Sequence, residues 1–169
     1  MKYFTFIPAI LLSLTSANVL ADTYICKSIT GTIQQLTPDP ECNILQAKPN
    51  HFPDVTFFGV AGTCFSGNLQ ATLDGNTPIT GTSYSGLTVN GIDQHQLTAA
   101  SAIRLNAGSI ELGRVFTKDV VFNPGGNTKE LLTMVGGSKM FHDGYGSLEI
   151  TGDALNQATS FTGELCIEN

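Results

Sequence analysis

The stretch that decides the fold is residues 130–152, which read ELLTMVGGSKMFHDGYGSLEITG. Its opening apolar run ends at Gly136-Gly137, a turn is expected over 138–143, and extended chain resumes at Tyr145. Two strands joined by a corner built from glycines would give this order. The rest of the chain is therefore expected to supply further strands that pack around this pair.

Turn signals recur along the remainder of the sequence. Residues 74–76 (Asp-Gly-Asn) and 90–91 (Asn-Gly) are typical of tight hairpins, and 123–127 (Asn-Pro-Gly-Gly-Asn) reads as a loop. A turn is also expected at Gly31, and a bend or bulge at Gly113 inside a long strand. This spacing predicts short antiparallel strands.

We expect eight to ten such strands and almost no helix. A short helix competes with strand only at 94–102, where the apolar residues do not alternate strictly. The predicted fold class is all-β, a single antiparallel β-barrel of about eight strands, with a β-sandwich as the alternative. The barrel is preferred because closure removes exposed strand edges.

The first 21 residues have the features of a signal peptide. Lys2 provides a positive start, 4–14 is an apolar run too short to span a bilayer, and 19–21 (Val-Leu-Ala) suits a cleavage site. We therefore expect a secreted or periplasmic protein with a single barrel domain at 22–169. No later segment reads as a membrane span.

The charge pattern excludes some classes of partner. The chain carries 14 acidic and 8 basic residues, a formal net charge of −6, with no run of like charge. Such a chain argues against nucleic-acid and anionic-membrane partners. Neither the ligand nor the oligomeric state follows from these residues.

Four cysteines predict two disulfides in an oxidising compartment. Three pairings are open, and we favour Cys26–Cys42 with Cys64–Cys166. The first would close a proline-rich loop, and the second would join two segments of similar pattern, CFSGNL and FTGELC. No C-x-x-C or H-x-x-H spacing indicates zinc, so no metal site is predicted.

Residues 116–122 (FTKDVVF), together with 130–152, resemble the dirigent and allene oxide cyclase superfamily. The similarity covers about 116–152 and rests on Val135, Gly136, Gly137, Lys139, Phe141, Gly144 or Gly146, and Leu148. It departs after Ser138, where the family has a further glycine.

That resemblance implies an eight-stranded barrel with an apolar interior. Dirigent proteins steer the radical coupling of phenolics, and allene oxide cyclases shape the closure of a fatty-acid epoxide. Both act largely by holding a ligand in a pocket. The family's catalytic acids lie outside the matched stretch, so none is carried over.

No catalytic motif stands out. His51, His95 and His142 are far apart and fall in expected loops, and the sequence contains no G-x-S-x-G motif. We therefore predict no catalytic residues and no cofactor.

Charged residues on expected strands are the remaining candidates for a site. These are Arg104, Glu111, Arg114 and Asp119. We predict that Glu111 and Arg114 point inward and bind a ligand, because charge is scarce and both flank Gly113.

The sequence favours a non-enzymatic binding module for a small apolar or amphipathic ligand. An isomerase or cyclase that acts by confining its substrate is the first alternative. A structural or surface-interaction protein is the second.

Overall fold

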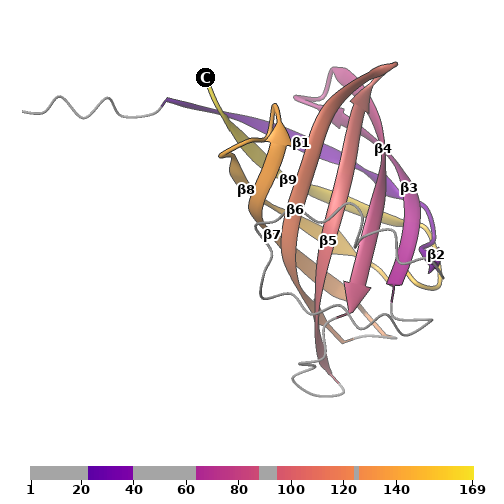
Figure 1. Ribbon diagram of the computed structural model, residues 1–169. Coiled ribbons are helices and arrows are strands. Elements are labelled where there is room, and N and C mark those ends of the chain that lie inside the picture. Colours follow the sequence, from indigo (N-terminus) through magenta and orange to yellow (C-terminus); the bar gives the residue numbers. More distant parts are fainter. Residues whose placement is uncertain (1–22, 40–63, 88–94, 124–125) are drawn as a thin grey trace, which may run out of the picture.

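The computed structural model describes residues 23–39, 64–87, 95–123 and 126–169. These residues form nine strands and no helix (Figure 1). The strands are β1 (Tyr24–Ile33), β2 (Thr37–Pro38), β3 (Cys64–Leu73), β4 (Thr77–Leu87), β5 (Gln96–Ala107), β6 (Ile110–Phe122), β7 (Lys129–Lys139), β8 (Tyr145–Thr151) and β9 (Thr159–Glu168). The described part of the segment that could have been helical, 94–102, is mainly strand β5.

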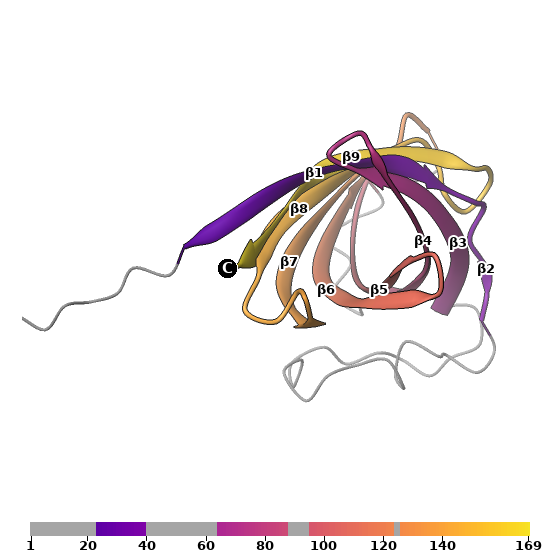
Figure 2. The same ribbon diagram turned by 90° about the horizontal axis from the view of Figure 1, so that it is seen from above.

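Eight of the strands close into an antiparallel barrel. Strands β3 to β9 follow one another as an up-and-down meander, and β1 lies between β9 and β3 (Figure 2). The short β2 adds to the outer edge of β3. The predicted all-β barrel is therefore confirmed, and the sandwich alternative is wrong.

Strand β1 closes the barrel with its second half, and its first half extends beyond the closed ring. Residues 29–33 pair with both β9 and β3, whereas 24–28 pair with β9 alone. A turn had been expected at Gly31, but the strand runs straight through it. A Cβ at Gly31 would collide with the carbonyl oxygen of Gln70, so glycine is needed because β3 approaches closely.

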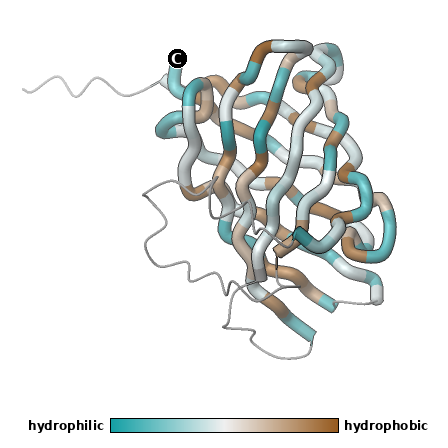
Figure 3. Tube along the Cα trace, turned by 45° about the vertical axis from the view of Figure 1, so that its right-hand side comes forward, coloured by the Kyte–Doolittle hydropathy of each residue, from teal (hydrophilic) through white to brown (hydrophobic). Residues whose placement is uncertain are grey.

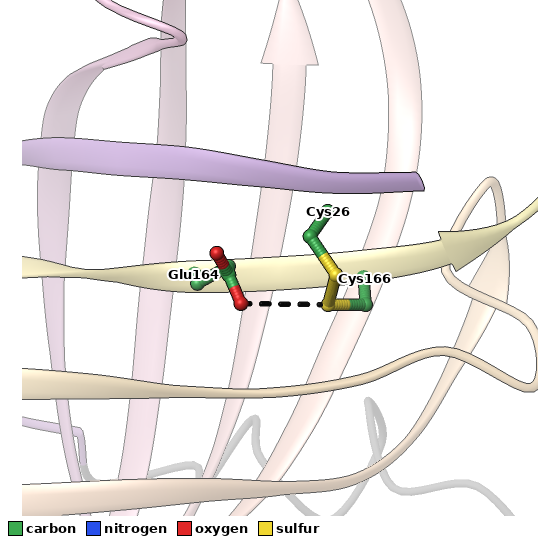
Figure 4. Close-up of side chains that lie close together, drawn as sticks. All are labelled: Cys26, Glu164 and Cys166. Carbon is green, nitrogen blue, oxygen red and sulfur yellow. Dashed lines mark hydrogen bonds between the residues drawn. A yellow bond between two sulfur atoms is a disulfide. The ribbon is translucent and has the colours of Figure 1, made fainter. Parts of the chain in front are cut away.

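The disulfide pairing differs from the prediction. Cys26 on β1 lies directly opposite Cys166 on β9, and the two sulfurs are bonded. Figure 4 shows this bond, with Glu164 Oε1 3.7 Å from Cys166 Sγ. The favoured Cys64–Cys166 pair is wrong because β1 separates β3 from β9. Cys64 is also disulfide-bonded, and Cys42 lies outside the described residues.

The glycine-built corner is present, but the chain turns later than expected. Strand β7 continues through Gly136 and Gly137 to Lys139, with an irregular register opposite Phe116 and Thr117. The turn occupies 140–144, and extended chain resumes at Tyr145 as predicted. Phe141 folds back from this turn into the core and is 2% exposed.

The remaining predicted turns and bends lie at 74–76, Gly113 and 90–91. The 74–76 turn joins β3 to β4, and the strand irregularity near Gly113 appears as a register shift between β5 and β6. The 90–91 turn lies outside the described residues.

The core fills the barrel interior unevenly. Hydrophobic and hydrophilic positions alternate along the strands (Figure 3). Apolar side chains from β1, β3, β5, β6, β8 and β9 pack so tightly in the middle that they leave a void of only about 10 Å³. Phe141 belongs to the same cluster. This part of the lumen has no room for a ligand.

Substituting Gly137 with alanine should destabilise the corner strongly. A Cβ at Gly137 would collide with the backbone carbonyl of Phe141, which cannot move without displacing a buried ring. We expect a loss of about 2–3 kcal/mol in the free energy of unfolding, measured with denaturant. Gly136→Ala is the matched control, because its Cβ meets no atom within 4 Å. Equal losses in both variants would contradict this packing.

Non-reducing peptide mapping should find Cys26 linked to Cys166. Replacing both cysteines with serine should cost on the order of 2–4 kcal/mol, because the bond closes a loop with a sequence separation of 140 residues. Denaturant unfolding of the variant and of the unmodified protein, both without a reductant, measures this loss, because a reductant would also break the bond made by Cys64. A peptide linking Cys26 to Cys42 would refute the assignment.

Candidate functional site

A cavity of about 240 Å³ opens at the end of the barrel where β6 ends and β7 begins. Its apolar wall includes Leu36, Phe65 and Leu97. Ser85 and Glu130 are among the polar groups on its surface. Ligand pockets combine an apolar lining with a few converging polar groups, and this cavity is slightly smaller than their usual ~300–1,000 Å³.

Polar residues gather on the inner face of β4, β5, β6 and β7. Successive side chains of a strand point to opposite faces, so alternate residues share the interior. Ser85 pairs with Ser101, and Ser101 pairs with Thr117, which places three hydroxyl residues side by side across three strands. The interior therefore has a polar side next to its apolar core.

A hydrogen-bonded chain leads from the cavity wall to a buried carboxyl group. Ser101 Oγ donates to Asp119 Oδ2 at 2.6 Å, and Ser85 Oγ lies 2.8 Å from Ser101 Oγ. Asp119 and Ser101 are each 2% exposed. Thr117 lies close enough to Asp119 to lower the pKa of its carboxyl group, but Asp119 Oδ1 and the hydroxyl of Thr117 make no hydrogen bond of good geometry within the described residues. Buried polar atoms without partners are costly, so each of them is a ready site for a polar group.

Asp119 and Glu130 form a pair of interior carboxyl groups. Asp119 is opposite Leu132, and Glu130 is opposite Val121, so the two acids are diagonal neighbours on one face of the β6–β7 ladder. Burial raises the pKa of Asp119 from 3.8 to about 6, and the hydrogen bond from Ser101 limits the rise. Burial, followed by repulsion from Asp119, raises the pKa of Glu130 from 4.5 to about 8. At neutral pH the pair therefore holds about one proton.

No positive side chain lines the described part of the cavity. Asp153 also lines it, but its two carboxylate oxygens accept bonds within its own turn, from Leu155 N at 3.0 Å and Asn156 Nδ2 at 2.6 Å. Glu130, by contrast, makes no hydrogen bond or ion pair with any described residue. It is the one acid that lines the cavity without a partner among the described residues.

This arrangement can exchange a proton near neutral pH and can accept hydrogen bonds from a bound molecule. The Ser85–Ser101–Asp119 chain contains no histidine, so it is not a Ser-His-Asp triad. The described residues bring a cluster of cysteine and carboxylate atoms together only at Cys26, Cys166 and Glu164. There the two sulfurs are bonded to each other, which leaves no thiolate to bind a metal.

The predicted ligand residues lie elsewhere. Glu111 forms an ion pair with Lys139 at 3.2 Å, and this contact lowers the pKa of Glu111. Arg114 pairs with Arg104 across β5 and β6 and alternates with Val115, which faces the core. Neither Glu111 nor Arg114 lines the cavity.

Of the three histidines, His142 contacts Asp143 at 2.8 Å on the surface, and His95 precedes β5. His51 lies outside the described residues.

Sequence reasoning missed Ser101, Asp119 and Glu130 as a group. Asp119 was among the charged residues on expected strands, and its parity with Val115 was a signal that it faces inward. Glu130 alternates with Leu132 and Met134, which belong to the core, so its parity was also a signal that it faces inward.

The chain matches no known protein-family model, and neither curated proteins nor solved structures give a match. Within the described residues, no helix has the length and apolar character needed to cross a membrane. Function is therefore inferred from the cavity itself.

Glu130→Gln should flatten the dependence of stability on pH. Between pH 4.5 and about 8, the folded chain keeps a proton on Glu130 that the unfolded chain releases. The free energy of unfolding of the unmodified protein should fall as pH rises through this window, by at most about 1.4 kcal/mol per pH unit from this group. Asp119 adds a further fall between 3.8 and about 6. Urea denaturation at several pH values measures the slope.

The matched control for this measurement is Glu149→Gln. Glu149 lies on the outer face of β8 and forms an ion pair with Lys129 at 3.3 Å. This variant should retain the fall in stability between pH 6 and about 8. If Glu130→Gln showed the same slope as the unmodified protein, the interior placement of Glu130 would be wrong.

Proposed function

We propose that this protein is an exported, non-enzymatic binding module that holds a small amphipathic ligand in the cavity at one end of its barrel. The observation that carries the proposal is the division of the lumen. One part is packed to a residual void of about 10 Å³, whereas the other retains about 240 Å³. An open, largely apolar space of that size can hold a small ligand, and burial of the ligand's apolar surface against Leu36, Phe65 and Leu97 would favour binding.

The chemistry of the walls supports an amphipathic ligand over a purely apolar one. Leu36, Phe65 and Leu97 offer apolar surface, while Ser85 on β4 and Glu130 on β7 offer polar atoms. A molecule with one polar group could satisfy the carboxyl side while burying its apolar body. Polar groups of this kind fix the orientation of a ligand more than they add affinity.

Export is part of the proposal. The signal-peptide features at 1–21 and a disulfide between Cys26 and Cys166 both suit a secreted or periplasmic protein. The resemblance to the dirigent and allene oxide cyclase superfamily agrees with a barrel that holds a ligand. The resemblance supports ligand binding as the mode of action, and it does not identify the ligand.

An isomerase or cyclase that acts by confinement is the second candidate. The observation that favours it is the Asp119–Glu130 pair, whose pKa values of about 6 and about 8 bracket neutral pH. Such a pair could take a proton from a confined substrate and return it at another atom. The two functions differ in what leaves the cavity, because a binding module releases its ligand unchanged.

Filling the cavity should abolish ligand binding without unfolding the protein. Ala99 is buried and lines the cavity. In Ala99→Leu, the added carbons should occupy the space that a ligand would take. We expect octan-1-ol to bind the unmodified protein and to bind Ala99→Leu at least about tenfold more weakly. Calorimetric titration measures the affinity, and the ligand-induced rise in Tm provides a second readout.

Leu97→Ala is the matched control, since it changes the same wall in the opposite direction. It enlarges the cavity, so binding should persist even though the protein loses some stability. Absence of octan-1-ol binding to the unmodified protein and to Leu97→Ala would count against the cavity as a binding site.

A further inference from the structure

We propose that the cavity is selective for protonated organic amines, with the ammonium group beside Glu130 and the apolar body against Leu36, Phe65 and Leu97. The inference rests on the proposed function and specifies the ligand class of the same site. Two observations carry it. Carboxyl oxygens in the interior lack strong hydrogen-bond partners, and no positive side chain lines the described part of the cavity.

Once Glu130 is ionised, the carboxylates of Glu130 and Asp119 offer more acceptor positions than the hydroxyls of Ser101 and Thr117 can fill. The carboxyl group of Glu130 makes no hydrogen bond or ion pair with a described residue, and Asp119 Oδ1 is buried with only Thr117 near it and no hydrogen bond of good geometry. Ser101 already donates its proton to Asp119. An ammonium group carries three donors and no acceptor, so it matches this surplus, whereas a carboxylate ligand would add acceptors to it.

The charges around Glu130 are negative or absent on each neighbouring element. On β6, Asp119 lies diagonally across from it, and after β8 the cavity wall includes Asp153. The lining residues of β3, β4 and β5 are uncharged; they are Phe65, Ser85, Leu97 and Ala99. Lys129, the residue before Glu130, contacts Glu149 on the outer face. A cation entering the described part of the cavity therefore meets no positive side chain.

Binding of a cation should also displace a proton. Glu130 has a pKa of about 8 and is therefore mostly protonated at pH 7. An ammonium group beside it favours the ionised carboxylate, so the complex forms as the carboxyl group loses its proton to the solvent. Up to about one proton should leave per ligand at pH 7, and affinity should rise about tenfold per pH unit up to about pH 8. The amine stays protonated throughout this range, so the charges balance.

The experiment compares three eight-carbon probes that differ only in their polar group. Octylamine, octan-1-ol and sodium octanoate are titrated calorimetrically into the full chain between about pH 6 and pH 8.5, in two buffers with different ionisation enthalpies. We expect octylamine to bind tightest, to bind more tightly as pH rises, and to release a proton. Glu130→Gln should remove the proton release and weaken octylamine by about ten- to a hundredfold, and it should weaken octan-1-ol much less, because an alcohol carries no charge. Glu149→Gln should behave like the unmodified protein.

The possible outcomes separate this inference from the proposed function. If octan-1-ol binds as tightly as octylamine and no proton is released, the amine preference is overturned while the binding function stands. If octanoate binds tightest and takes up a proton, the ligand is an acid and the inference is again overturned. Full octylamine affinity in Glu130→Gln would overturn it as well. If none of the three probes binds, the binding function itself fails.

Discussion

The pairing of β1 along both of its edges is the constraint on which this structure depends. Ten residues of β1 pair with β9 and five pair with β3, so one strand joins the last strand of the meander to its first. Without it, β3 and β9 would each expose a row of unpaired backbone groups. The Cys26–Cys166 bond holds the part of β1 that extends beyond the ring, where β9 is its only strand partner. Closure thus combines hydrogen bonds, a close approach at Gly31 and one covalent link.

Closing the sheet forces every second side chain into the lumen, and the size of those side chains then decides where space remains. Isoleucine, leucine and phenylalanine fill the interior from β1, β8 and β9. On β4 and β5 the inward positions near the open end are occupied by Ser85, Ala99 and Ser101, which are too small to meet across the barrel. The cavity therefore follows from small side chains at three neighbouring positions, and it needs no special backbone geometry.

The sequence was sufficient for the fold class because that inference needs only strand number, turn positions and the cost of open edges. Tyr145, the 74–76 turn and the irregularity at Gly113 could all be placed from local chemistry. The disulfide pairing could not be predicted, because it depends on the position of β1 between β9 and β3. The spacing of the cysteines in the sequence carries no information about that position. The strand through Gly31 was missed for a related reason. Glycine signals a turn locally, but here it serves a contact with Gln70, which is 39 residues away in the chain.

The site was harder to predict because facing direction depends on register, and irregularities change register. Glu111 and Arg114 were chosen for their closeness to Gly113, yet the shift between β5 and β6 falls at that point, and Arg114 ends up opposite Arg104. Asp119 lies beyond the shift and faces inward. The shift in β7 lies at 134–136, so Glu130 and Asp119 share a regular stretch of the β6–β7 ladder and the same inner face. The irregularity at Gly113 could be placed from the sequence, but which side chains face inward around it could not, because that depends on the register with β5.

In the proposed function, the free-energy cost of the interior acids serves ligand binding. Two carboxyl groups whose pKa values are raised by folding lower stability at neutral pH, and leucine or valine at either position would avoid that loss. The closed ring and its disulfide add stability, so the protein can remain folded despite this loss. Strained or costly polar groups are usually found where a protein meets its ligand, and here they coincide with the one region of the described lumen that is not packed. That coincidence of burial cost, unpaired acceptors and open volume is the physical argument for placing the function at Glu130 and its neighbours.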